Sequence, residues 1–185
     1  MMVNDGWHET TIRVRYKDTD RLGVVYYGNY LTFFEVGRAE FMRDLGFPYS
    51  KIESDGYSLV VTEAAAKYHD NVGYDALVTV RTRIADLRRV RIRFDYQVVS
   101  DGRHLLVSGY TVHACMDSNK KLTRIPPDVR EVIEKNLVKS SEAPSQADPS
   151  SVAGYCGGRA TLSPGMAIPL PPGRRPYGPE ARRYL

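Results

Sequence analysis

Residues 29–45 constrain the fold most, because they form the longest stretch with helical periodicity in the sequence. Apolar side chains recur there at steps of three and four, at Leu31, Phe34, Phe41 and Leu45, with Arg38 in the same series. Such a helix is roughly 25 Å long. It carries too many aromatic side chains to lie exposed. Asn29 is expected to cap its start and Gly46 to follow its end. The sequence therefore predicts a buried central helix.

Strand patterns flank this helix on both sides. Alternation of apolar and basic residues predicts a half-buried strand at residues 11–17. Four more strands are expected at residues 57–68, 77–84, 89–99 and 105–116, and a short terminal helix at 127–137. The order β-α-β-β-β-β-α predicts an α+β fold in which an antiparallel meander wraps around the central helix.

Composition divides the chain into a body and an extension. Of the 11 prolines, 8 lie between residues 144 and 179, so residues 139–185 are expected to be an irregular extension of a domain formed by residues 1–138. That domain carries 20 basic and 19 acidic residues, which argues against a nucleic-acid partner. No apolar run is long enough to span a membrane. Cys115 and Cys156 are too far apart for a disulfide framework or zinc site, so no metal is expected and a cytoplasmic location is the default.

The loop at residues 16–30, between the first strand and the helix, is the most distinctive segment. Two acids, Asp18 and Asp20, precede an apolar run that leads into the start of the helix. Unpaired N–H groups at a helix start can hold a developing oxyanion, and a nearby carboxylate can act as a base or nucleophile on an acyl group. Taken alone, the pattern is also typical of turn and capping residues.

This loop resembles the signature of the hotdog-fold acyl-CoA thioesterases, the 4-hydroxybenzoyl-CoA thioesterase/YbgC-like family. That group carries a pattern similar to D-x-D-x-x-G-[IV]-V-[YW]-[HY]-x-N-Y, followed by an aromatic helix with F-x-E-x-x-R. The present sequence supplies Asp18, Asp20, Gly23, Val24, Val25, Tyr26, Tyr27, Asn29, Tyr30, Phe34, Glu35 and Arg38. The resemblance covers residues 9–137 and leaves the extension out. It implies a hotdog fold and hydrolysis of an acyl-CoA to a carboxylic acid and free CoA.

The resemblance also implies roles for single residues. Asp20 matches the carboxylate that attacks the thioester or activates water, and the backbone N–H of Tyr27 matches the oxyanion donor. Gly23, Val25 and Asn29 match positions beside the substrate. Many members have His in place of Tyr27, so the remaining chemistry rests on Asp20 and the helix start. Whether Tyr27 stacks on an aromatic acyl group or only packs is left open.

Further implied contacts lie outside the loop. Arg88, Arg89 and Arg91 match a basic stretch that binds CoA phosphates in the resembling enzymes. Hotdog domains resemble one another in pairing their sheets edge to edge, so a homodimer or homotetramer is expected, and Val61 and Thr62 are expected to line the acyl pocket of the neighbouring subunit. CoA is part of the substrate, and no separate cofactor is expected. Glu35 is a secondary candidate for the acid, and it can instead pair with Arg38. The alternative function is a non-catalytic module that binds acyl thioesters or acyl carrier protein.

Overall fold

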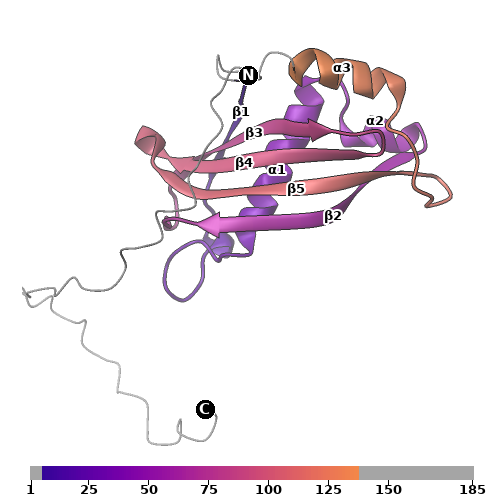
Figure 1. Ribbon diagram of the computed structural model, residues 1–185. Helices are drawn as coiled ribbons and strands as arrows, with labels where there is room; N and C mark the ends of the chain where they lie inside the picture. The colour runs from indigo at the N-terminus through magenta and orange to yellow at the C-terminus, as the bar shows by residue number, and fades with distance from the viewer. Residues whose placement is uncertain (1–5, 138–185) are drawn as a thin grey trace, which may run out of the picture. The chain divides into compact units, whose positions relative to one another are not determined.

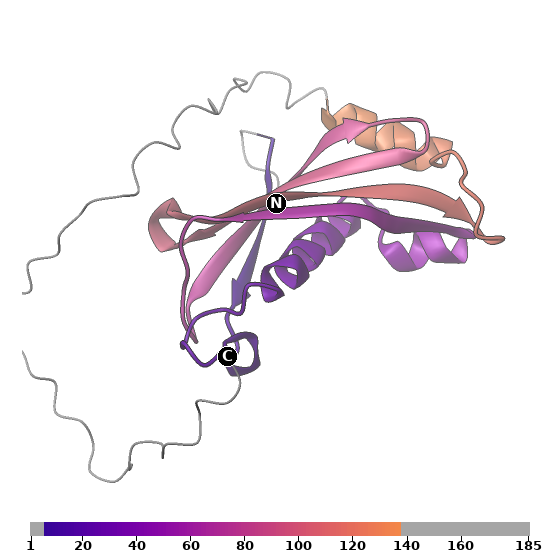
Figure 2. The same cartoon turned by 60° about the horizontal axis from the view of Figure 1, so that its bottom comes forward.

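The computed structural model describes residues 6–137 and contains one sheet of five antiparallel strands in the order β1-β3-β4-β5-β2 (Figure 1). The predicted extension at 139–185 lies outside the described residues. The strands are β1 (His8–Arg13), β2 (Tyr57–Tyr68), β3 (Leu77–Leu87), β4 (Arg91–Ser100) and β5 (Leu105–Asp117). The helices are α1 (Asn29–Asp44), α2 (Tyr49–Ser54) and α3 (Pro127–Leu137), with short 3₁₀ turns at Tyr16–Asp18 and Asp101–Arg103. Helices α1 and α2 lie on one side of the sheet (Figure 2).

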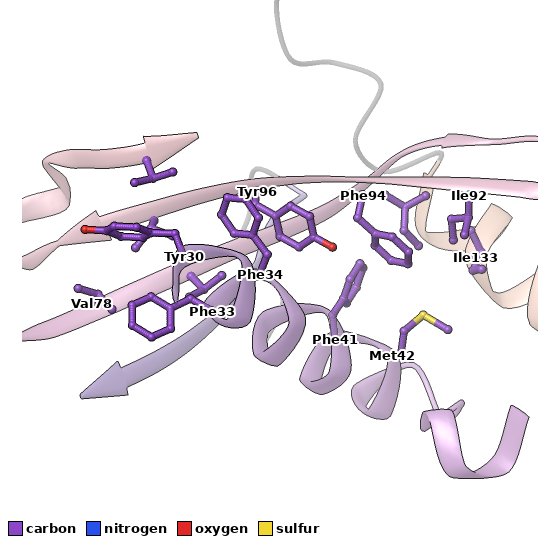
Figure 3. Close-up of a cluster of buried hydrophobic side chains, with 14 of the residues drawn as sticks. Tyr30, Phe33, Phe34, Phe41, Met42, Val78, Ile92, Phe94, Tyr96 and Ile133 are labelled. Carbon is purple, nitrogen blue, oxygen red and sulfur yellow. The ribbon is translucent and has the colours of Figure 1, made fainter. Parts of the chain in front are cut away.

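Helix α1 is the predicted central helix, and it is buried along one side (Figure 3). The buried residues are Tyr30, Phe33, Phe34, Gly37, Phe41 and Met42. The expected stripe is therefore wrong at Leu31, which is 42% exposed, because the buried side is turned toward β1 and β3. Gly37 allows this close approach, since a Cβ there would lie 2.6 Å from Cγ1 of Val80.

The helix start differs from the prediction and the helix end agrees with it. Gly28 occupies the capping position, and the Asn29 side chain donates instead to the carbonyl of Asp18 at 2.9 Å. Asn29 thus ties the helix to the loop before it. Gly46 follows the last helical residue with a φ of +84°, as expected for a glycine that ends a helix.

Three other expectations about the elements are wrong. The first strand ends at Arg13, because the Asp18 carboxylate accepts the Arg15 N–H and turns the chain into a 3₁₀ turn. Strand β2 does not pair with β3 in a meander. It pairs with β5 at the far edge, and β1 takes the place beside β3. Helix α2 was not expected, because six residues are too few to reveal a helical period.

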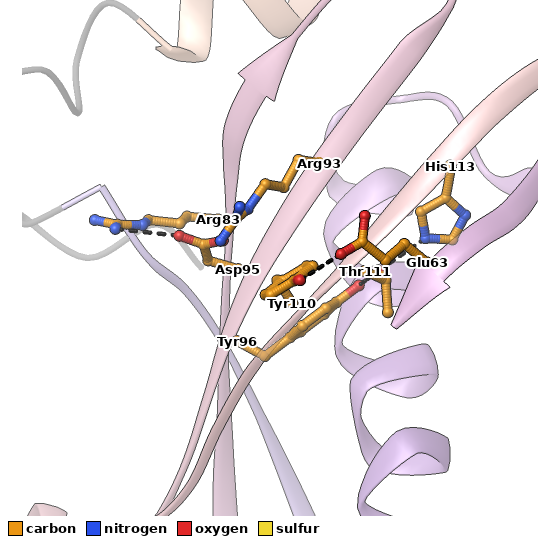
Figure 4. A network of polar contacts seen from close by, with 8 residues as sticks. All are labelled: Glu63, Arg83, Arg93, Asp95, Tyr96, Tyr110, Thr111 and His113. Atoms are coloured by element: carbon orange, nitrogen blue, oxygen red, sulfur yellow. Dashed lines mark hydrogen bonds and ion pairs between the residues drawn. The ribbon is translucent and has the colours of Figure 1, made fainter. Parts of the chain in front are cut away.

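A polar network is buried between the sheet and α1 (Figure 4). Tyr96 and His113 each contact Thr111 Oγ1 at 2.8 Å, and Nη1 of Arg38 lies 3.2 Å from Nε2 of His113. The predicted pair of Arg38 with Glu35 is not formed, because Arg38 turns to His113 and to the ring of Tyr49. Burial and the charge of Arg38 lower the pKa of His113 to about 4.

We expect this histidine to make the fold sensitive to acid. The pKa of His113 is lower in the folded chain than the ordinary 6.5, so its contribution to stability is complete above pH 6.5. It is lost as the pH falls toward 4, where about 3 kcal/mol of the free energy of unfolding should disappear. Urea unfolding of the wild type and of His113→Gln at several pH values measures this. Equal pH dependence in the two proteins would contradict the prediction.

Candidate active site

The loop between β1 and α1 is anchored by Asp18. Its Oδ2 accepts hydrogen bonds from the backbone N–H and from Nε of Arg15, at 2.9 and 3.0 Å. Its carbonyl accepts the N–H of Tyr26 and the side chain of Asn29. Burial acts to raise the pKa of Asp18, but the hydrogen bonds and charge of Arg15 outweigh it and hold that pKa below its ordinary value. Asp18 therefore holds the loop in place and keeps no side-chain oxygen free for a substrate, since Oδ1 accepts from Nη2 of Arg15.

Asp20 is the second acid of the loop, and its carboxylate is only partly engaged. Oδ1 accepts the N–H of Leu22 at 2.7 Å, while no described residue donates a hydrogen bond to Oδ2. The turn is closed by backbone hydrogen bonds from Asp20 to Val24 and from Gly23 to Asp20, with Gly23 at a φ of +78°. Asp20 is partly exposed. Its second oxygen is thus held in a rigid turn and available to a ligand.

The start of α1 supplies donors beside this turn. Neither Tyr27 nor Gly28 gives its backbone N–H to another described residue, whereas the next three N–H groups bond back to residues 26–28. The neighbouring Tyr27 hydroxyl is the main cause that raises the pKa of the Tyr26 phenol, with smaller contributions from burial and from the charge of Asp20. Free N–H groups at a helix start and a nearby carboxylate are the two parts that acyl transfer requires.

The aromatic side chains of the loop lie at the surface. Tyr27 is 61% exposed, its ring centroid is 4.5 Å from that of Tyr26, and its carbonyl accepts a hydrogen bond from the Tyr68 hydroxyl at 3.2 Å. Val25, by contrast, is 4% exposed and its side chain packs in the core. The loop therefore presents Asp20, Gly23 and Tyr27 outward, close to the end of β2.

The predicted acyl-pocket residues lie farther along β2. Val61 is 50% exposed, and the hydroxyl of Thr62 donates to the carbonyl of Val112 at a β-bulge. Among the described residues, strand β2 pairs only with β5, and its other edge has no strand beside it. Within one chain, Val61 and Thr62 are not brought to Asp20.

The predicted phosphate-binding arginines lie at the opposite end of the sheet from the loop. Arg89 lines a pocket of about 780 Å³ together with Tyr57, Thr123, Arg124, Ile125, Pro126, Pro127 and Arg130. No carboxylate among the described residues pairs with Arg89 or Arg124. Arg88 pairs with Asp86 at 2.9 Å, and neither it nor Arg91 lines the pocket. Sequence reasoning missed Arg124 and Arg130, which flank Pro126-Pro127 without any spacing that links them to Arg89.

The loop that carries Asp20 and the pocket that contains Arg89 lie far apart within one chain. Strand β3 begins next to the loop, where Asp75 bonds to Val14, and it ends before Arg88. Its eleven residues span about 33 Å. The residues predicted to act on one substrate therefore form two separate groups in a single chain.

The remaining charged candidates lie on the outer face of the sheet or at the surface. Arg83 and Arg93 pair with Asp95 (Figure 4), and Arg81 pairs with Glu9, while the ring of Trp7 covers Arg81 and Arg83. On the same face Glu63 accepts a hydrogen bond from Tyr110.

Within residues 6–137, no three His, Cys, Asp or Glu side chains are grouped so that they could hold a metal ion. None of the helices in that range is long and apolar enough to cross a membrane.

Comparisons with known proteins agree with this architecture. The sequence profile of the thioesterase-like superfamily matches residues 14–133. The acyl-CoA thioesterase YbgC of Haemophilus influenzae is 34% identical over 132 residues, which cover 70% of this chain and 95% of that protein. The acyl-CoA thioester hydrolase YbgC of Escherichia coli is 28% identical over 116 residues, which cover 63% of this chain and 87% of that protein.

A solved structure extends the comparison to the fold. The DHNA-CoA thioesterase of Staphylococcus aureus superposes with a TM-score of 0.70 at 31% identity, over 74% of this chain and 94% of that one. The hotdog fold indicated by the loop signature is thus confirmed. The matched region contains the candidate loop, the central helix and all strands after it. The chain therefore belongs to the thioesterase-like superfamily.

Proposed function

We propose that the protein is an acyl-CoA thioesterase whose active site is the loop that carries Asp20 and Tyr27. The observation that carries the proposal is the pairing of a partly free carboxylate with two free N–H groups at the start of α1. The YbgC relatives, which are named for acyl-CoA hydrolysis, support the choice of substrate. Water and the side chains of the protein suffice for this reaction, without a separate cofactor.

Each part of the site has a chemical role in the proposed reaction. Asp20 takes a proton from water, whose oxygen bonds to the thioester carbonyl carbon. The carbonyl oxygen becomes an oxyanion, which the N–H groups of Tyr27 and Gly28 stabilise at the positive end of the α1 dipole. Collapse of this intermediate breaks the carbon–sulfur bond, and the proton on Asp20 goes to the CoA thiolate. The products are the carboxylic acid and free CoA.

We further propose that two chains pair through the open edge of β2 to complete each site. Tyr68 at one end of β2 touches the catalytic loop, and Tyr57 at the other end lines the arginine pocket. An antiparallel pairing of two β2 strands centred near Thr62 places the pocket of one chain beside the loop of the other. The exposed Val60 and Val61 favour such pairing. Full activity at a protein concentration where sedimentation shows only monomers would contradict this pairing.

The arginine pocket is proposed to hold the phosphates of CoA, because Arg89 and Arg124 are cations in a concave site and no carboxylate of residues 6–137 pairs with either. We expect Arg89→Ala to raise KM for an acyl-CoA about 10-fold with little change in kcat. Hydrolysis of the matching acyl-pantetheine, which lacks the nucleotide phosphates, should be unaffected. Arg88→Ala, which removes the neighbouring arginine outside the pocket, is the control. A larger effect from Arg88→Ala than from Arg89→Ala would show that the pocket is misassigned.

Release of free thiol from a panel of acyl-CoAs tests the proposed function. The panel contains benzoyl, hydroxybenzoyl, and short and long aliphatic acyl groups. Hydrolysis of some of these supports the assignment, and the preferred acyl group shows whether Tyr26 and Tyr27 act by stacking. Binding of acyl-CoA without any thiol release would favour the alternative, a non-catalytic module that binds acyl thioesters.

A further inference from the structure

Arg38 is a cation inside the fold for which residues 6–137 provide no acidic partner. It is part-buried on α1, its Nη1 contacts His113, and its guanidinium lies 5.5 Å from the ring centre of Tyr49. No carboxylate among the described residues forms an ion pair with it. Its Nε is buried and has no hydrogen-bond partner. A buried charge of this kind normally has an anionic or acceptor-rich partner.

The groups around Arg38 supply more donors than acceptors. A guanidinium can only donate, so Nε2 of His113 is an acceptor and the proton of this neutral ring lies on Nδ1. His113 is 0% exposed, and its ring interacts with the backbone of Leu59. The oxygens of Tyr49 and Tyr96 face Arg38, while Nε of Arg38 is left without a partner. The cluster of Arg38, Tyr49 and His113 therefore has one positive charge and no carboxylate among the described residues to balance it.

An apolar surface connects this cluster with the catalytic loop. Leu31 and Arg38 lie on one side of α1 at helical spacing, about 10 Å apart along the axis, and Tyr27 stands in the loop just before the helix. On β2, Val61 is directly opposite His113, and Ala64 and Tyr68 follow on the same face of the sheet toward the loop. Helix α1 packs against β1 and β3, so Leu31, Val61 and Tyr68 remain 42%, 50% and 46% exposed. We name Tyr27, Leu31, Val61, Ala64 and Tyr68 the acyl strip.

We infer that the acyl group lies along the acyl strip and that Arg38 and Tyr49 select acyl groups whose far end carries a hydrogen-bond acceptor, a carboxylate above all. The inference rests on the proposed thioesterase function. The two ends of the acyl strip differ, so the strip fits one kind of ligand in one direction. The N–H groups at the loop end suit a thioester carbonyl, and the positive charge of Arg38 at the other end suits an anion. The exposed Glu35 lies on the same side of the helix, and its negative charge opposes such a ligand.

The test compares acyl groups that differ only at the far end. Mono-CoA esters of dicarboxylic acids, from adipoyl to hexadecanedioyl, are compared with plain acyl-CoAs of the same carbon number by thiol release. We expect kcat/KM to favour the carboxylate-ended member by about 10- to 100-fold at lengths that reach Arg38. In Arg38→Met this ratio should fall to about one. Arg43→Met, on the exposed side of the same helix, should keep the wild-type ratio.

Tyr49→Phe keeps the inference testable if Arg38→Met does not fold, because it removes one oxygen and keeps the ring that Arg38 contacts. A ratio lowered several-fold is expected there. The inference is overturned if the wild type shows no preference at any length, or if neither variant changes the ratio. If no acyl-CoA of any kind is cleaved, the proposed function itself has failed, which is a different result from hydrolysis without discrimination.

Discussion

Asp20→Asn is expected to lower kcat for acyl-CoA hydrolysis by about 100-fold or more, because an amide cannot accept the proton of water as a base does. The substitution should leave the fold intact. The oxygen of asparagine can still accept the Leu22 N–H that now bonds to Oδ1 of Asp20. Thiol release under saturating substrate measures kcat, and circular dichroism checks the fold.

Asp18→Asn is the matched control for this experiment. The Asp18 carboxylate is committed to Arg15, so its loss should lower the melting temperature and change kcat far less than Asp20→Asn does. If Asp20→Asn keeps more than a tenth of the wild-type kcat, Asp20 is not the base. Glu35, exposed on the helix that provides the N–H donors, is then the next residue to test.

Gly109→Ala is expected to destabilise the fold strongly. A Cβ at this position on β5 would overlap the carbonyl oxygen of Ala65 on β2 and lie 2.7 Å from Cε2 of Phe34. Backbone cannot move aside within a paired strand, and Phe34 is held by stacking on Tyr96 with a centroid distance of 4.4 Å. Overpacking of this kind costs about 4 kcal/mol or more, a large part of the stability of a domain.

A glycine in open space provides the comparison. A Cβ on Gly46 would meet nothing within 4 Å, so Gly46→Ala has only the strain of its φ of +84° to overcome. That should cost about 1 kcal/mol. Thermal unfolding of the two variants separates crowding from backbone strain. A melting temperature for Gly109→Ala within a few degrees of the wild type would show that β2 and β5 can separate locally.

Local patterns predicted local structure well. The spacing of Phe34 and Phe41 identified α1 within one residue of its end, and β2 and α3 have the predicted bounds. The loop signature identified the segment that holds Asp20 beside the start of α1. These features are encoded by residues close together in the sequence, where periodicity and turn chemistry act directly.

What the patterns could not predict depends on distant contacts. The place of β2 at the edge follows from pairing with β5, some fifty residues later, and no local feature of β2 specifies that partner. Asn29 was expected to cap the helix because its type favours that role, but the carbonyl of Asp18 competes for its side chain. Arg124 joins Arg89 in a pocket only because the chain turns back after β5.

In the proposed pairing through the edge of β2, catalysis depends on the amount of protein. If each site needs a loop from one chain and an arginine pocket from another, then halving the protein concentration near the dissociation constant of the pair removes more than half of the activity. Specific activity should therefore fall on dilution. An excess of an inactive Asp20→Asn chain should change the activity per wild-type chain, because the two chains form mixed pairs with shared sites. Under the proposed pairing, the unpaired edge of β2 thus couples the activity per chain to the protein concentration.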